Sequence, residues 1–257
     1  MKKRKIGIRH AKVLCLVLFF LFYSRIFVPQ NLLAGFGVNI SGDVSVYSQY
    51  IWRGMVLDRD AVAQSSIYLT YPVNSSGKFK IGAWSSQDLE NKDSLKSEEF
   101  DYVLDYTCDF ERLNISLGHT YYDFVDTDTF SREFYLGLTL KELLFSPSVF
   151  CYRDYGRSED GGGEGTYILI SGSKSIPIKN RAFTLDLGAH AGFNHELFIA
   201  GDGGDLGFKL GVNMPLAKDL IFSPNINFSH PFSDLRNQND GNQKDRVYCG
   251  CTLTYSF

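Results

Sequence analysis

Apolar and polar residues alternate along most of the chain from residue 37 onward, which is the pattern of β-strands that have one apolar face. In the clearest block, Phe100, Tyr102 and Leu104 alternate with Asp101 and Asp105. The blocks are about as long as the ~9–11 residues that a membrane strand needs. The pattern predicts twelve strands, at residues 37–52, 62–72, 78–86, 99–110, 112–123, 130–140, 144–155, 166–175, 182–193, 204–214, 218–230 and 245–257.

The connections between these predicted strands alternate in length. Short turns separate some neighbours, whereas the connections at 87–98, 156–165 and 231–244 are longer and polar. Short turns on one rim and long loops on the other are typical of outer-membrane barrels, and closure leaves no strand edge unpaired in lipid. We therefore expect an all-β fold, a transmembrane antiparallel up-and-down barrel of about twelve strands. A water-soluble β-sandwich also alternates, but glycine recurs with Ser, Thr, Asn and Asp between the apolar positions, which favours a polar, crowded interior.

Both ends of the sequence carry export and assembly features. A basic segment up to Lys12, an apolar run at 13–22 and the sequence around Ala34 follow the plan of a secretory signal peptide. We expect residues 1–34 to be removed and 35–257 to form the barrel, with a retained membrane anchor as the alternative. At the other end, Leu253, Tyr255 and Phe257 lie in phase, which resembles the C-terminal signal that the barrel-assembly machinery of bacterial outer membranes recognises.

Composition narrows the function classes. The chain has 21 Phe and 15 Tyr among its 257 residues, a skew that suits pleated surfaces. Beyond the N-terminal segment no apolar run reaches the about 18 residues of a membrane helix, which excludes a polytopic helical transporter. Residues 35–257 hold 19 basic and 29 acidic side chains, so nucleic acid is not an expected partner.

No catalytic, cofactor or metal site is predicted. The cysteines outside the signal segment, Cys108, Cys151, Cys249 and Cys251, fall on apolar strand faces and are expected to be lipid-facing. A lipid-acting membrane enzyme would place a Ser/His pair on one outer face, and the sequence places none on a single strand. The histidines at 119 and 230 fit an interfacial aromatic belt better. The glycine-rich segments at 161–165 and 201–205 lack the spaced ligands of a calcium loop.

Charged residues on the inward phase suggest what the barrel transports. Seven acids and three bases are phased inward, which predicts a weak preference for cations. The expected function is a porin-like channel in the bacterial outer membrane for passive diffusion of small polar solutes, with outer-membrane lipids and the assembly machinery as partners. A scaffolding barrel with a plugged lumen and a lipid-acting enzyme are the alternatives. Asp154 is one of the seven inward-phased acids. The residues expected to line the pore are Asp43, Arg53, Lys80, Trp84, Asp101, Asp105, Asp109, Glu133, Asp186, His190 and Lys209.

Several short motifs, in order along residues 40–257, resemble the TorF-type porin family. They comprise Tyr50-Ile51-Trp52-Arg53-Gly54 followed by Ala61-Val62-Ala63-Gln64, then Ile81–Ser86, Glu99–Tyr102, Leu117–Asp123, Glu133–Gly137 and Gly165–Tyr167. The chain departs from the family pattern at Val56, Ala61 and Ser65, where the family usually has Ser, Pro and Gly. The resemblance implies an outer-membrane, porin-like barrel and implies no particular solute.

Overall fold

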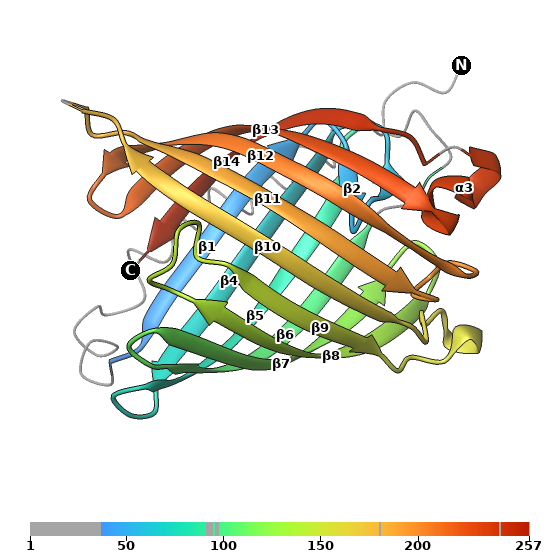
Figure 1. Cartoon of the computed structure of the whole chain (residues 1–257), viewed down its shortest axis with the longest axis horizontal. Helices are drawn as coiled ribbons and strands as arrows, with labels where there is room; N and C mark the ends of the chain where they lie inside the picture. Colours follow the sequence, from blue (N-terminus) through green and yellow to red (C-terminus); the bar gives the residue numbers. More distant parts are fainter. Residues whose placement is uncertain (1–36, 91–94, 96–97, 180, 242, 257) are drawn as a thin grey trace, which may run out of the picture.

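Twelve antiparallel strands close into a barrel (Figure 1), in the order β1-β14-β13-β12-β11-β10-β9-β8-β7-β6-β5-β4. The computed structural model describes residues 37–256 without 91–94, 96–97, 180 and 242, so the expected signal peptide and Phe257 lie outside the described residues. The predicted fold class is confirmed. The wall strands are β1 (Asn39–Tyr47), β4 (Val62–Pro72), β5 (Gly77–Asp88), β6 (Glu99–Asp109), β7 (Leu113–Phe124), β8 (Thr129–Leu140), β9 (Ser148–Asp154), β10 (Thr166–Pro177), β11 (Thr184–His195), β12 (Asp202–Ala217), β13 (Leu220–Ser233) and β14 (Arg246–Ser256).

The wall separates an apolar outer face from a polar interior. Ile81, Leu104 and Leu136 point outward and keep 59%, 49% and 51% of their surface exposed, whereas Asp105 and Glu133 are buried inside. An exposed apolar belt of this extent is unfavourable in water and suits the hydrocarbon core of a bilayer. Among the described residues, no helix is long and apolar enough to cross a membrane.

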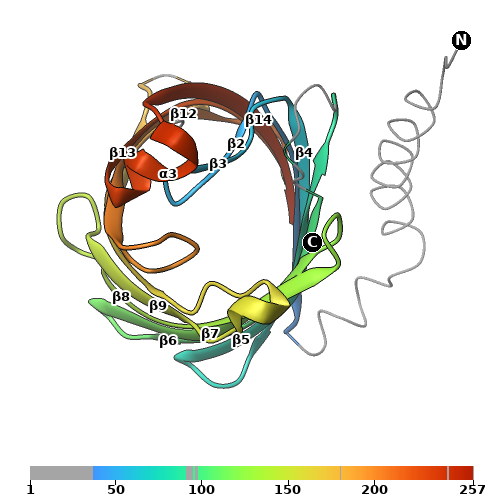
Figure 2. The same ribbon diagram turned by 90° about the vertical axis from the view of Figure 1, so that its right-hand side faces the viewer.

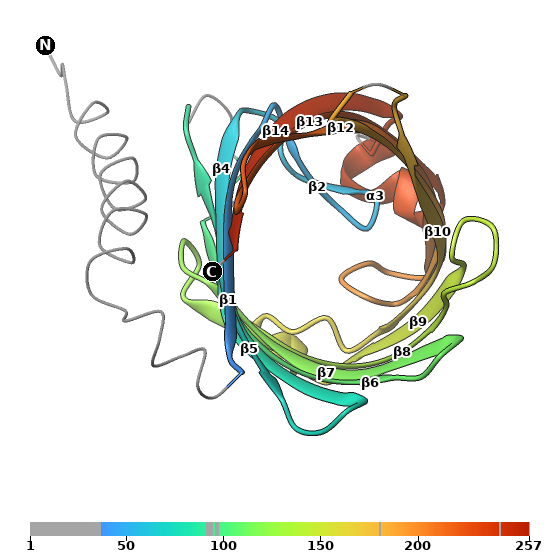
Figure 3. The ribbon, with the colours of Figure 1, turned by 90° about the vertical axis from the view of Figure 1, so that its left-hand side faces the viewer.

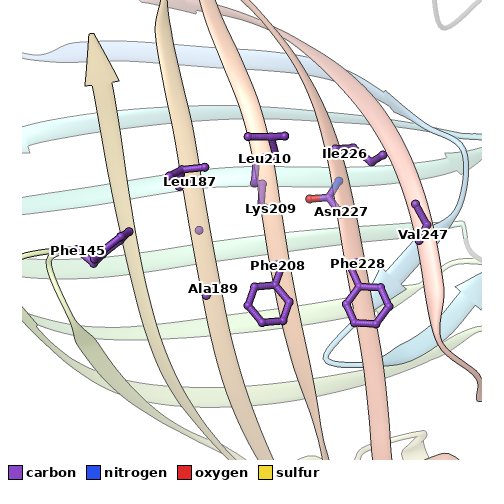
Figure 4. A pocket seen from close by; sticks show the side chains of 11 residues that line it. Phe145, Leu187, Ala189, Phe208, Lys209, Leu210, Ile226, Asn227, Phe228 and Val247 are labelled. Atoms are coloured by element: carbon purple, nitrogen blue, oxygen red, sulfur yellow. The ribbon is translucent and has the colours of Figure 1, made fainter. Parts of the chain in front are cut away.

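The outer face also carries a shallow apolar groove over β11, β12 and β13 (Figure 4). Its volume is about 540 Å³, and Leu187, Phe208, Leu210 and Phe228 contribute to its lining, with Phe145 at one side. Ala189, whose side chain is small, also lines it. The groove therefore continues the apolar belt.

Glycines in the wall make room for aromatic rings on neighbouring strands. The Tyr135 ring on β8 lies across Gly118 of β7, and the Tyr167 ring on β10 lies across Gly192 of β11. A Cβ atom at either glycine would overlap the ring. The recurring inward glycines of the sequence thus accommodate inward tyrosines, whose hydroxyls are then free to reach lumen carboxylates.

Connections differ between the two rims, as the sequence predicts. The turns between β4 and β5, β6 and β7, and β12 and β13 are short, and β1 begins and β14 ends at the same rim. The opposite rim carries the longer connections, with the 3-10 helix η1 (Ser158–Asp160) and the helix α3 (Asp234–Gly241), at the right-hand end of Figure 1. The sequence pattern did not predict α3, which lies in the segment expected to be a loop.

The first predicted strand, 37–52, is wrong in its second half. The wall strand ends at Tyr47, and the chain then forms a hairpin of β2 (Tyr50–Trp52) and β3 (Met55–Asp58) that pairs only with itself. Its turn uses a positive φ at Arg53 (50°) and at Gly54 (77°), a backbone conformation that glycine adopts easily. The views along the barrel show this hairpin inside the wall (Figures 2 and 3).

A small apolar cluster lies inside the barrel at the rim with the long loops. Met55 of the hairpin, Ile199 of the connection between β11 and β12, and Leu235 of α3 form it, with 7%, 9% and 0% exposure. Trp52 and Phe198 pack against this cluster. Figure 2 shows all three segments within the outline of the barrel. Three separate loops are therefore held together over the lumen.

Candidate functional site

The luminal hairpin is anchored at its tip by a buried ion pair. The guanidinium of Arg53 donates to both carboxylate oxygens of Glu133 on β8, at 2.6 and 2.8 Å. The two side chains are only 9% and 1% exposed. Tyr122 of β7 donates its hydroxyl to the same carboxylate at 3.0 Å. Charge-assisted, bidentate bonds of this kind are among the stronger polar contacts in proteins.

Aromatic rings surround the Arg53 guanidinium. Its central carbon lies 4.4 Å from the ring centre of Trp52, 4.3 Å from that of Tyr152 and 4.7 Å from that of Tyr167. Burial lowers the pKa of Arg53, but the hydrogen bonds and charge of Glu133 outweigh burial and hold this pKa above its ordinary value. The guanidinium therefore stays charged, and the rings favour that charge.

A second anchor lies at the start of the hairpin. The Tyr50 hydroxyl donates to Glu99 of β6 at 2.8 Å, and the Tyr50 ring packs against Trp84 of β5 with centres 5.7 Å apart. Burial, with the negative charges of Glu99 and Asp101, raises the pKa of Tyr50 well above its ordinary value. Tyr50 therefore remains a hydrogen-bond donor at physiological pH.

These anchors show that the hairpin crosses the lumen. It emerges between β1 and β4, while Glu133, Tyr152 and Tyr167 stand on β8, β9 and β10. Around the ring, β9 is six strands from β1 in one direction and five from β4 in the other. Glu133 lies near the end of β8 at the long-loop rim, so the crossing constricts that end of the barrel.

A hydrogen-bond network beside the constriction joins three wall strands. Asp205 of β12, with 1% exposure, accepts from the hydroxyl of Tyr167 and pairs with Nε2 of His190, both at 2.7 Å. From the sequence, His190 is expected only to line the pore, and its partner Asp205 on the next strand was missed. The register that brings Gly207 opposite His190 and Asp205 near it could be read only from the structure.

Buried Asp154 organises a loop. It accepts from the Ser131 hydroxyl at 2.6 Å and from the backbone nitrogens of Gly156 and Gly163 at 2.9 and 3.2 Å. This carboxylate ties the connection between β9 and β10 to the end of the barrel. Its role in the structure is therefore local fixation of the chain.

The aspartates of β6 do not form one uniform ladder. Asp101 lies beside the hairpin anchor, and Asp105 accepts from the hydroxyl of Tyr135 at 2.6 Å. Asp109 reaches the short-turn rim, where it pairs with Lys141 at 2.5 Å and Lys78 at 3.7 Å. The three carboxylates are spread along the length of β6, so each has different neighbours.

The other expected pore residues lie along the lumen between the constriction and the short-turn rim. Asp43 accepts a hydrogen bond from Ser66. The Nζ atom of Lys80 lies 5.4 Å from the ring centre of Tyr68. Lys209 is exposed between inward glycines. Asp186 accepts from Ser175 at 2.5 Å and from Asn213. This half of the interior is polar and less buried than the constriction.

The outward histidines contact aromatic and acidic side chains, and the described cysteines are free. His119 contacts the Tyr155 hydroxyl through Nε2 at 2.8 Å and packs on Phe134, while His230 pairs with Asp245 at 2.9 Å. No group of three or more His, Cys, Asp or Glu side chains suited to a metal ion occurs within the described residues. Cys151 and Cys249 are exposed and unpaired on the outer face.

One family model matches residues 33–226, about three quarters of the chain, and its description is "Bacterial protein of unknown function (Gcw_chp)". The chain belongs to this family. The Gcw_chp description differs from the TorF-type name suggested by the motifs, and that finer name stays a prediction. Among curated proteins, none matches this Gcw_chp chain in sequence.

Solved structures with the same fold include a membrane protein from work on in-meso crystallization, with a TM-score of 0.53, 9% identity, and coverage of 85% of this chain and 84% of that chain. The KdgM porin (TM-score 0.49, 9% identity) and the NanC porin (0.49, 7%) each match 85% of the Gcw_chp chain and 99% and 98% of their own. At such identities the likeness concerns the fold alone.

Proposed function

We propose that this Gcw_chp protein is an outer-membrane channel for passive diffusion of small polar solutes, narrowed at one end by the β2–β3 hairpin. The observation that carries the proposal is a polar, acid-containing lumen enclosed by an apolar outer wall. A scaffold needs no polar surface through its interior, whereas a water-filled path does. Twelve strands leave a lumen that inward side chains fill only in part.

The proposed location follows from the same wall. A closed barrel satisfies its backbone hydrogen bonds without water, and long loops on a single rim are typical of the bacterial outer membrane. The apolar belt and the groove beside Phe208 would contact outer-membrane lipids. The last strand, with Leu253 and Tyr255, would present the assembly signal to the barrel-assembly machinery.

The electrostatics favour cations. Glu99, Asp101 and Asp105 are buried toward the lumen without an ion pair to another described residue, and the buried Arg53 is already paired with Glu133. Unbalanced carboxylates in a narrow, poorly screened lumen raise the local cation concentration. We therefore expect a weak cation preference.

Reversal potentials in planar bilayers test the proposal. Under a KCl gradient the wild type should select cations. The triple variant Asp101→Asn, Asp105→Asn, Asp109→Asn should be less selective. The effect should fade at molar salt, where the Debye length is about 3 Å. Glu111→Gln, a change at an exposed rim position, is the matched control. Anion selectivity in the wild type would refute the electrostatic proposal.

The luminal apolar cluster favours a second candidate, a structural barrel with a plugged lumen. Met55, Ile199 and Leu235 bind three loops over the same end of the barrel. The same recordings separate the two candidates. A silent wild type that conducts only when the hairpin is deleted supports the plugged barrel, and steady conductance of the wild type supports the open channel.

A further inference from the structure

Two neighbouring carboxylates beside the hairpin lack a basic partner in the described structure. Glu99 and Asp101 lie two residues apart on the inward face of β6, and each is 7% exposed. Glu99 accepts from the Tyr50 hydroxyl, but Oδ1 of Asp101 is buried without a hydrogen-bond partner. Arg53 is taken by both oxygens of Glu133. A buried oxygen without a hydrogen-bond partner is unfavourable, so Oδ1 of Asp101 is open to a ligand.

A buried hydroxyl stands opposite the same pair on the neighbouring strand. Ser86 of β5 stands directly opposite Glu99 in the strand register, faces the interior, and is 1% exposed. Its Oγ also has no hydrogen-bond partner. Directly opposed side chains have Cβ atoms about 4.5–5.5 Å apart, so the hydroxyl lies beside the Glu99 carboxylate without bonding to it. Two buried oxygens without hydrogen-bond partners thus stand on adjacent strands beside Glu99.

We propose that Glu99, Asp101 and Ser86 form a binding site for a hard divalent cation of the Ca²⁺ type. All available donors are oxygens, which Ca²⁺ prefers, and two carboxylates balance its charge. Lumen water would complete the about 6–8 ligands that Ca²⁺ takes in flexible geometry. Because only three protein side chains contribute, the dissociation constant should lie near the weak end, about 10⁻⁴–10⁻³ M.

The site shares one ligand with the hairpin anchor. Glu99 receives the Tyr50 hydroxyl through Oε2, which leaves Oε1 for the cation. A bound ion would thus fix the carboxylate that holds the start of the hairpin. This inference concerns ion binding and does not depend on whether the barrel conducts.

Calcium binding to the full barrel, refolded in detergent and stripped with EGTA, tests the site. Titration calorimetry with CaCl₂ should show one saturable site in the wild type. Asp101→Asn and Glu99→Gln should each weaken binding at least tenfold, and Ser86→Ala, which deletes a single oxygen atom, several-fold.

Two control variants match these changes. Asp186→Asn removes a lumen carboxylate that already has two donors, and Ser229→Ala removes another buried hydroxyl without a partner, which stands opposite Gly207 and Arg246. Both should bind Ca²⁺ as the wild type does. Absence of saturable binding, or equal loss in the controls, would overturn the proposal. The heat-modifiable gel shift verifies that each variant folds. If a charge variant fails to fold, the weaker Ca²⁺ binding expected of Ser86→Ala still tests the site.

Discussion

Replacing Glu133 with Gln removes the negative charge of the hairpin anchor while keeping its size. Arg53 would then stay in its aromatic surroundings without a counter-ion, and Tyr122 would lose a charged acceptor for its hydroxyl. The wall strand β8 keeps its backbone pairing, because the change affects only a side chain. We expect the hairpin to open more often while the barrel remains intact.

The magnitude follows from the burial of the pair. With exposures of 9% and 1%, solvent screens the two charges little, and removing one partner of a buried pair costs about 3–5 kcal/mol. Two charge-assisted hydrogen bonds at about 1.5–3 kcal/mol each give about 3–6 kcal/mol, which is similar. Since about 1.4 kcal/mol corresponds to a factor of ten, a cost of about 3–5 kcal/mol should make hairpin opening about 10²- to 4 × 10³-fold more frequent.

Amide hydrogen exchange of residues 50–58 in detergent micelles measures this opening. Protection there should fall by the stated factor in Glu133→Gln, and the double variant with Arg53→Ala should lose less than the sum of the single changes. Arg157→Ala, which breaks an exposed pair with Glu159, is the control and should leave protection unchanged. Additive single changes within about 0.5 kcal/mol would refute the assigned coupling.

Three further outcomes follow from the wall and its ends. Leu104→Arg should lower the free energy of unfolding from lipid vesicles by about 2–4 kcal/mol, whereas Asp105→Asn should change it little, and similar effects would contradict the assigned faces. Gly118→Ala should displace the Tyr135 ring and break its bond to Asp105, seen as altered near-ultraviolet circular dichroism, while an unchanged spectrum would contradict the packing. Deleting Phe257 should lower the yield of heat-modifiable barrel in the outer membrane, and an unchanged yield would argue against an assembly signal.

The wall could be predicted from the sequence because lipid and lumen impose opposite demands on alternate residues. The bounds of β4 agree with the prediction, and β6 differs by one residue. β9 is shorter than predicted, beginning at Ser148 instead of residue 144, since the preceding residues form a turn against the outer wall, where the Phe145 carbonyl accepts from the nitrogen of Ser173. Strand ends depend on such local contacts, which alternation does not encode.

The constriction could not be predicted, because its residues alternate like a wall strand. Tyr50 and Trp52 continue the pattern of β1, and only the turn at Arg53 and Gly54 departs from it. The interior of a barrel accepts aromatic side chains from an inserted hairpin as readily as lipid accepts them from a wall strand. Partners such as Glu133 are 80 residues away, so they depend on ring closure and register.

The path of the hairpin across the lumen has a consequence for the order of assembly. Its tip can bind only when β8, β9 and β10 stand opposite β1, and its apolar side also needs Leu235, which follows β13 in the chain. Although the hairpin is made early in synthesis, its docking is among the last native contacts to form. Slow exchange of its amides therefore marks barrels whose first and last strands have already joined.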